Sequence, residues 1–134
     1  AQILRLLKSL QQQTRTAILL ITHDLGVVAQ VCSRVVVMYG GLVMEEGSVE
    51  DIFYRPAHPY TQGLLASLPR PDEVNQRLSP IEGSPPGLLN PPPGCPFAER
   101  CPKRMPQCER QPAFYTVGEG HRAACWLWAE EVQA

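Results

Sequence analysis

Four cysteines near the end of the chain have the spacing of a ligand set. Cys95, Cys101, Cys108 and Cys125 follow the pattern C-x5-C-x6-C-x16-C. The first three lie in the stretch GCPFAERCPKRMPQC, whose three prolines oppose a regular helix or a central strand. Four thiolates can bind a zinc ion or an iron–sulfur cluster, and such a site gives order to loops that lack regular hydrogen bonding.

Three explanations fit these thiols: disulfides, free cysteines and metal coordination. No signal peptide is readable at the N-terminus, and a reducing cytosol opposes stable disulfides. Free thiols would leave a small module without any internal staple. Four-thiolate coordination is therefore favoured. The gaps are wider than the C-x2-4-C pairs typical of zinc, and longer irregular loops suit a larger cluster, so spacing alone leaves the metal open.

Two further residues are assigned outside this set. Cys32 falls on the apolar face of a predicted helix, which favours a buried and inert thiol. His121 is expected to be a surface histidine. The alternatives for His121 are that it replaces one cysteine as a ligand or donates a hydrogen bond to the site.

A second candidate for chemistry is the pair His23-Asp24 in LLITHDLG, directly after an apolar run. Ligands of open α/β sheets bind beyond the carboxyl ends of the strands, and an imidazole there can donate a hydrogen bond to an anionic oxygen. The alternative is a histidine that caps the next helix or pairs with backbone groups. Position alone does not decide between the two.

The first predicted elements place this histidine. Residues 3–10 have apolar side chains at helical spacing. The run AILLIT, residues 17–22, is typical of a strand buried on both faces. Residues 24–33 then predict a short helix, with Asp24 favoured at its N-terminus.

The next predicted elements form a hairpin and two helices. Strands are expected over 34–39 and 42–47, joined by a turn at Gly40-Gly41 that tolerates positive φ. Ser48 and Asp51 form an approximate capping box for a helix over 48–53. A last helix is expected over 58–68, with Pro59 in its first turn.

Composition divides the 134 residues into parts. Twelve of the fourteen prolines lie between Pro69 and Pro112. We therefore expect an α/β part over 1–68, a proline-rich linker over 69–94 in extended or polyproline-like form, and a loop-dominated, cysteine-rich extension over 95–134. Disorder is the alternative for the linker, and Ile81, Leu88 and Leu89 are the few expected anchors against it.

Charge and hydropathy exclude some functions. The net charge is −1 and no basic stripe is present, so no nucleic-acid partner is expected. No apolar run approaches the roughly 20 residues that a membrane-spanning helix needs. The chain starts without Met inside an amphipathic pattern, which suggests a piece of a longer protein.

The order of several segments resembles a known family. AQILRLLKSLQ, LLITHDLGVVA, VVVMYGGLVMEEG, HPYTQGLL and the cysteine segment are similar to the C-terminal third of ATP-binding cassette (ABC) ATPases. Specifically, these segments resemble the nucleotide-binding subunits of oligopeptide, dipeptide and related nickel or glutathione importers. This resemblance implies a P-loop NTPase fold, ATP and Mg as cofactors, and ATP hydrolysis coupled to transport in the parent protein.

The resemblance also implies roles for single residues. His23 matches the switch histidine of the family, which contacts the γ-phosphate of ATP and helps to organise the attacking water. Cys95, Cys101, Cys108 and Cys125 match cysteines that ligate a [4Fe-4S] cluster in members of the family. A structural staple is the favoured purpose of the extension; redox sensing or docking to a partner subunit is the alternative.

The resemblance further implies transmembrane permease subunits and a second ATPase subunit as partners, at the cytoplasmic face of the plasma membrane. Three family elements are missing from this sequence: a G-x-x-x-x-G-K-[ST] loop, an LSGGQ-like signature and an apolar strand that ends in Asp-Glu. We therefore expect the isolated chain to be inactive. The competing hypothesis is a stand-alone cysteine-rich module, binding iron–sulfur or zinc, for interaction or redox sensing.

Overall fold

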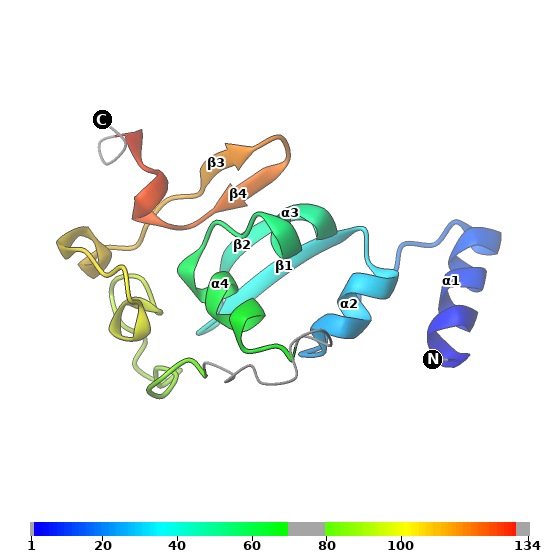
Figure 1. Ribbon diagram of the computed structural model, residues 1–134, viewed down its shortest axis with the longest axis horizontal. Coiled ribbons are helices and arrows are strands. Elements are labelled where there is room, and N and C mark those ends of the chain that lie inside the picture. The colour runs from blue at the N-terminus through cyan, green and yellow to red at the C-terminus, as the bar shows by residue number, and fades with distance from the viewer. Residues whose placement is uncertain (1, 70–79, 131–134) are drawn as a thin grey trace. The chain divides into compact units, whose positions relative to one another are not determined.

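The computed structural model describes residues 2–69 and 80–130 (Figure 1), and the chain divides into two compact units, the first ending at Ser33 and the second beginning at Arg34. The first unit holds helix α1, Gln2–Thr14, and helix α2, Leu25–Val31. The second unit holds all four strands and the remaining helices.

The first unit confirms both predicted helices and contradicts the predicted strand. Asp24 is the N-cap of α2, because its Oδ1 accepts a hydrogen bond from Val27 N–H at 3.0 Å. Residues 17–22 form no strand, and Leu19 and Ile21 are 90% and 91% exposed. A strand needs a hydrogen-bonded neighbour, and no described segment of this chain pairs with residues 17–22.

The second unit is built on the predicted hairpin. Strands β1, Arg34–Tyr39, and β2, Leu42–Ser48, pair antiparallel. Gly40 and Gly41 connect them with φ of 57° and 80°, which favour glycine. Alternate residues of β1 are buried, as expected for a strand with one covered face.

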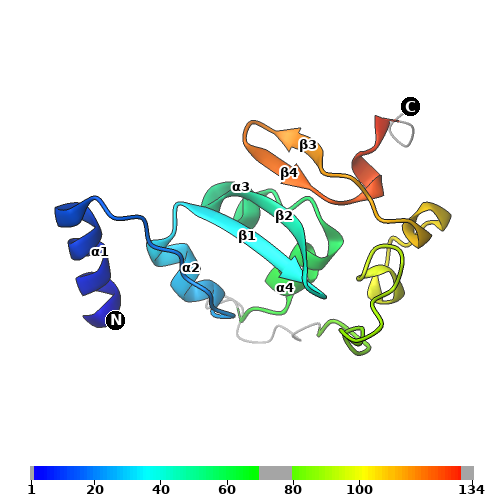
Figure 2. The same cartoon turned by 180° about the vertical axis from the view of Figure 1, so that it is seen from behind.

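Two short helices cover one face of this hairpin, as Figures 1 and 2 show from opposite sides. Helix α3, Val49–Tyr54, begins with the predicted capping box: Asp51 N–H donates to Ser48 Oγ, and Ser48 N–H donates back to the Asp51 carboxylate. Helix α4, Pro59–Ala66, begins one residue after His58. Both helices are therefore fixed by local side-chain caps.

The cysteine-rich extension contains two strands that the sequence did not predict. Strands β3, Tyr115–Gly118, and β4, His121–Ala123, form a second hairpin, and β4 pairs antiparallel with β2. The sheet order is β1-β2-β4-β3. The extension is thus joined to the first hairpin through the backbone of β2. The residue of β2 just before these pairs, Met44, also takes part, because its carbonyl oxygen accepts a hydrogen bond from Ala124 N–H at 2.8 Å.

The described end of the proline-rich segment, residues 80–94, forms no helix or strand, in agreement with the prediction. Ile81 packs against the core cluster, but Leu88 and Leu89 are 72% and 95% exposed, so their expected anchoring role is wrong here. Arg100 holds this segment instead, because its guanidinium donates to the carbonyl oxygens of Ile81 and Glu82. Residues 70–79 lie outside the described residues.

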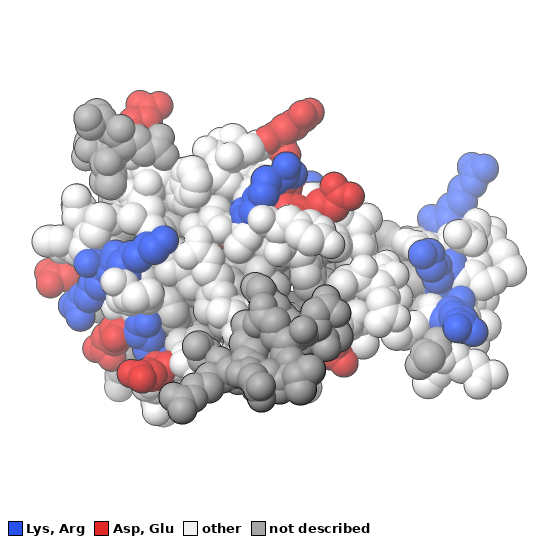
Figure 3. All heavy atoms as spheres, viewed as in Figure 1, with Lys and Arg blue, Asp and Glu red and all other residues white. Residues whose placement is uncertain are grey.

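Acidic and basic side chains lie in small mixed groups on the face of the second unit seen in Figure 3. Among the helices of the described residues, none combines the length and hydropathy of a membrane span.

Candidate functional site

His23 lies in a short segment whose backbone is held on both sides. Asp24 N–H donates to Thr22 Oγ1 at 3.0 Å, and the Asp24 side chain caps α2. The His23 side chain is exposed, and no described residue makes a hydrogen bond to its ring. The local structure therefore fixes the backbone at His23 and leaves the imidazole accessible to a ligand.

The first three cysteines lie on a compact loop at the edge of the core. Cys95 N–H donates to the Cys108 carbonyl oxygen at 2.9 Å, which closes the loop. One turn of 3-10 helix, Ala98–Arg100, lies inside the loop, and a second, Pro106–Glu109, contains Cys108 at its end. Cys95 and Cys108 are buried in one cluster with Tyr39, Met44 and Phe97, and Cys101 packs against it.

Backbone amides point at the sulfur atoms of this loop. Lys103 N–H donates to Cys101 Sγ at 3.4 Å, and Met105 N–H donates to Cys108 Sγ at 3.5 Å. Burial raises the pKa of Cys95 and Cys101, whereas the nearby amides of Phe97 and Lys103 oppose that rise because they stabilise a thiolate. Such hydrogen bonds to sulfur are a common feature around thiolate ligands of metal centres.

Cys125 reaches the same region from the other end of the extension. It precedes the 3-10 turn Trp126–Trp128 and is buried. Burial raises its pKa to about 11; the amide of Leu127 opposes this, and the negative charge of the other three thiolates adds to it. The residue that follows Cys125, Trp126, packs against the cluster that contains Cys95 and Cys108. Within residues 2–69 and 80–130, no group of three or more His, Cys, Asp or Glu side chains is arranged to hold a single metal ion.

Cys32 and His121 differ from their predictions. Cys32 lies just past the end of α2 and is only half-buried, because the helix ends at Val31. His121 is 4% exposed rather than on the surface, and its Nε2 lies 2.7 Å from Glu45 Oε1. His121 is thus paired with a carboxylate of β2, a residue that sequence reasoning did not single out.

Glu45 is fully buried and accepts two backbone hydrogen bonds besides that of His121. Ala57 N–H donates to Oε1 at 2.7 Å, and His58 N–H donates to Oε2 at 2.9 Å. A buried carboxylate without such donors would be strongly destabilising. The only sequence feature that marks Glu45 is its place directly after the apolar run of a strand. An acidic residue at such a place is just as often exposed, so the sequence does not predict its burial.

His58 begins helix α4 with its side chain. Its Nδ1 accepts a hydrogen bond from Tyr60 N–H at 3.0 Å, which satisfies one free amide of the first turn. The ring is buried, and burial lowers its pKa to about 4, although the Glu45 charge and the Ala124 carbonyl act in the opposite direction. The tripeptide His58-Pro59-Tyr60 is therefore a helix start, with Tyr60 packed against Tyr39 and Phe97.

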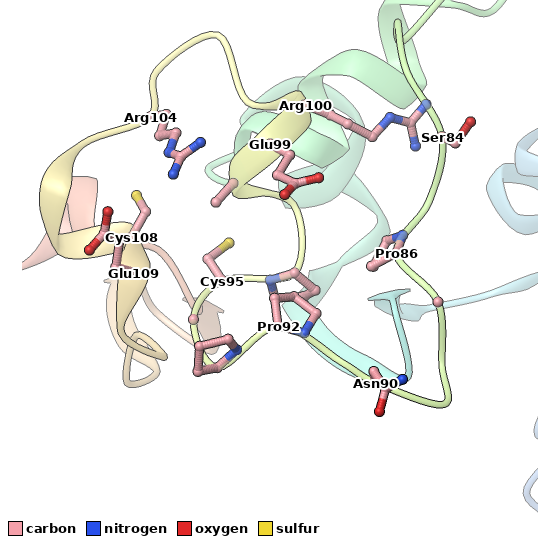
Figure 4. A pocket seen from close by; sticks show the side chains of 15 residues that line it. Ser84, Pro86, Asn90, Pro92, Cys95, Glu99, Arg100, Arg104, Cys108 and Glu109 are labelled. Carbon is pink, nitrogen blue, oxygen red and sulfur yellow. The ribbon is translucent and has the colours of Figure 1, made fainter.

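A cavity of about 540 Å³ borders the cysteine loop (Figure 4). Its lining comes partly from the proline-rich segment, residues 84–96, which includes Cys95, and partly from residues 98–109, which include Arg104, Cys108 and Glu109. Two of the four sulfur-bearing side chains thus border a cavity with both acidic and basic groups at its rim.

Known proteins resemble this chain over nearly its whole length. The family described as oligopeptide/dipeptide transporter, C-terminal region, matches residues 44–108. The dipeptide transport ATP-binding protein DppD of Bacillus subtilis is 56% identical over 95% of this chain and 38% of its own length. The oligopeptide transport ATP-binding proteins OppD of Haemophilus influenzae and AppD of Bacillus subtilis are 49% and 51% identical, each over 98% of this chain and 41% and 40% of their own lengths.

The chain spans about two fifths of the length of these relatives. The competing hypothesis of a stand-alone cysteine-rich module finds no support, because each of these relatives is named as an ATP-binding protein of peptide transport. The chain belongs to the ABC family of oligopeptide and dipeptide transport ATP-binding proteins, and it corresponds to their C-terminal region.

Proposed function

We propose that this chain is the C-terminal part of a subunit that binds and hydrolyses ATP for a membrane importer of peptides or related small solutes. The observation that carries the proposal is the 56% identity to a dipeptide transport ATP-binding protein over 95% of the chain. The parent protein would use ATP and Mg, with most of their ligands outside this chain. It would bind transmembrane permease subunits at the cytoplasmic face of the plasma membrane and pair with a second ATPase subunit.

His23 is the residue of this chain that acts on ATP. Its exposed imidazole would donate a hydrogen bond to a γ-phosphate oxygen and help to position the attacking water. The support is local: the Asp24 cap and the Thr22 hydroxyl hold the backbone next to His23, and the imidazole is exposed. A placed donor stabilises developing charge without reorganisation during the reaction.

The test is steady-state ATP hydrolysis by the full-length protein with His23→Ala. We expect kcat to fall by about 100-fold or more while nucleotide binding changes little, because the interaction forms mainly with the transferred group. Asp24→Asn is the matched control. Asparagine also caps helices well, so this variant should keep wild-type turnover.

A raised KM with unchanged kcat in His23→Ala would contradict this role. The isolated chain should not hydrolyse ATP, since it lacks the phosphate loop, the signature and the acidic strand end. Turnover by the isolated chain that disappears in His23→Ala would overturn that expectation.

The cysteines are the proposed ligands of a [4Fe-4S] cluster, with zinc as the alternative. Cys95, Cys101, Cys108 and Cys125 would hold it. The support is that three of the four thiols are buried and Cys101 is partly buried, and that backbone N–H groups donate to the sulfurs of Cys101 and Cys108. A bound cluster would order the extension and could also accept an electron.

Anaerobic purification of the full-length protein tests this assignment. Iron and sulfide in equal amounts, with broad visible absorbance, would support the cluster. Zinc found by elemental analysis in a colourless protein would refute the iron assignment and keep the four ligands. Single Cys→Ser variants should each lower the metal content, and Cys32→Ser should leave it unchanged.

A further inference from the structure

Glu45 connects β2 to two segments that are distant in sequence. Its carboxylate accepts hydrogen bonds from the backbone of Ala57 and His58 and from the ring of His121, at 2.7, 2.9 and 2.7 Å. Glu45 and His121 are 0% and 4% exposed. Because the site excludes water, these donors are what stabilise the carboxylate, and its loss would leave them buried without an acceptor.

The segments that Glu45 holds also fix both sides of Cys125. On one side, β4 pairs with β2 at Glu45↔Ala123, and Ala124 N–H donates to the Met44 carbonyl oxygen. On the other side, Trp128 Nε1–H donates to the carbonyl oxygen of Ala57, at 3.1 Å. Ala57 is the residue whose own N–H is bound by Glu45.

Met44, the residue before Glu45 on β2, packs in the cluster of the other three cysteines. Met44 is fully buried in the cluster that contains Cys95 and Cys108, with Cys101 packed against it. The β1–β2 register shifts at this point, because Met44 has no partner on β1 and forms a bulge, and Met44 and Glu45 are both buried. Strand β2 therefore carries Met44 against the three-cysteine loop and Glu45 against the segments that flank the fourth cysteine.

Space for this arrangement is provided at Gly47. A Cβ at this position would lie 3.1 Å from Cδ2 of His121 and 3.2 Å from Cβ of Asp51. These distances are tighter than ordinary contacts, so the absence of a side chain at Gly47 makes room for the His121 ring beside Glu45.

We infer that Glu45 is a positioning residue of the four-cysteine site: it is no ligand, but with His121 it sets the place of Cys125 relative to the other three thiols. This inference rests on the proposed metal site. It also assigns a purpose to His121, which acts through Glu45 rather than as a replacement ligand.

The experiment compares Glu45→Gln with Glu46→Gln in the full-length protein. Glutamine retains the shape of Glu45 but presents an NH2 group to a backbone or imidazole donor. Glu46 is the matched control, because it lies on the same strand pair, forms an exposed ion pair with Arg122, and undergoes the same change of charge. The alkylation rate of each cysteine is measured by mass spectrometry in metal-free protein, and iron, sulfide and zinc are measured in protein as purified.

We expect Glu45→Gln to raise the alkylation rate of Cys125 by about tenfold or more, while those of Cys95 and Cys108 change less than about twofold. The metal content should fall in the same variant. Glu46→Gln should match the wild type in every measurement. Equal acceleration at all four cysteines would mean general unfolding and would overturn the inference, as would wild-type protection of Cys125.

A second pair of variants keeps the test decisive if Glu45→Gln does not fold. His121→Gln retains an N–H donor for Glu45 and should largely preserve the protection of Cys125, whereas His121→Leu should lose it. Equal behaviour of the two would contradict the inference. If the wild type binds neither iron nor zinc, the proposed metal site fails, but selective exposure of Cys125 would still support the positioning role.

Discussion

His58 is a buried histidine whose ring is favoured in its neutral form by the folded structure. Burial lowers its pKa from 6.5 to about 4, against the attraction of Glu45. In the unfolded chain the ring takes up a proton below about pH 6.5, while the folded ring stays neutral down to about pH 4. The free energy of unfolding should therefore fall as the pH is lowered from 6.5 to 4, by about 3 kcal/mol from this residue.

Urea unfolding of wild type and His58→Asn at a series of pH values measures this contribution. Asparagine can cap α4 but does not titrate in this range, so the variant should lose the pH dependence and keep most of the stability at pH 7. His23→Asn, at an exposed histidine, is the control for the loss of an imidazole as such. Parallel profiles for wild type and His58→Asn would show that His58 does not cause the loss.

The roles of some single residues could be predicted from the sequence, and those of others could not. The roles of Asp24, Ser48 and Asp51 as caps were predictable, because a cap depends on side chains and amides within three residues. The burial of Glu45 was not, because its partners Ala57 and His121 are 12 and 76 residues away. When the partners of a residue are distant in the sequence, the types of its neighbouring residues do not indicate its role.

At the scale of elements, the cysteine loop depends on a glycine. A Cβ at Gly94 would overlap the carbonyl oxygen of Cys108 and the backbone of Glu109, which are not free to move as a side-chain end would be. Gly94→Ala should therefore separate the two ends of the loop and break the hydrogen bond from Cys95 to Cys108. We expect a loss of about 1–3 kcal/mol in the free energy of unfolding, measured by urea denaturation.

Gly87→Ala is the matched control in the same proline-rich region. No atom lies within 4 Å of a Cβ built at Gly87, so its effect should stay below about 0.5 kcal/mol. Equal stability of the two variants would show that the close approach at Gly94 does not constrain the loop.

The helices and strands differ in whether nearby residues or distant partners determine them. Hairpin β1–β2 and helices α3 and α4 were predictable because their turn glycines, capping box and N-terminal proline lie inside or next to each element. Strands β3 and β4 are four and three residues long, and their place depends on pairing with β2, so no periodic pattern revealed them. The reverse holds for residues 17–22, whose strong apolar pattern has no partner strand among the described residues.

At the scale of the whole molecule, one face of the first hairpin exposes two apolar side chains of β1. Val36 and Met38 are 54% and 57% exposed on β1, on the face opposite Val37 and Tyr39, which are buried. Relatives are more than twice as long as this chain. We expect the remainder of the full-length protein to cover this face, since uncovered apolar strands favour self-association.

The double substitution Val36→Thr and Met38→Thr separates the isolated chain from the full-length protein, because threonine keeps strand propensity and removes apolar surface. In the isolated chain it should reduce self-association, measured by light scattering. In the full-length protein it should lower the free energy of unfolding by about 1–3 kcal/mol, since two hydroxyl groups would be buried. Leu89→Thr, at a residue 95% exposed, should not destabilise the full-length protein. A double variant of unchanged stability in the full-length protein would show that this face remains in water there.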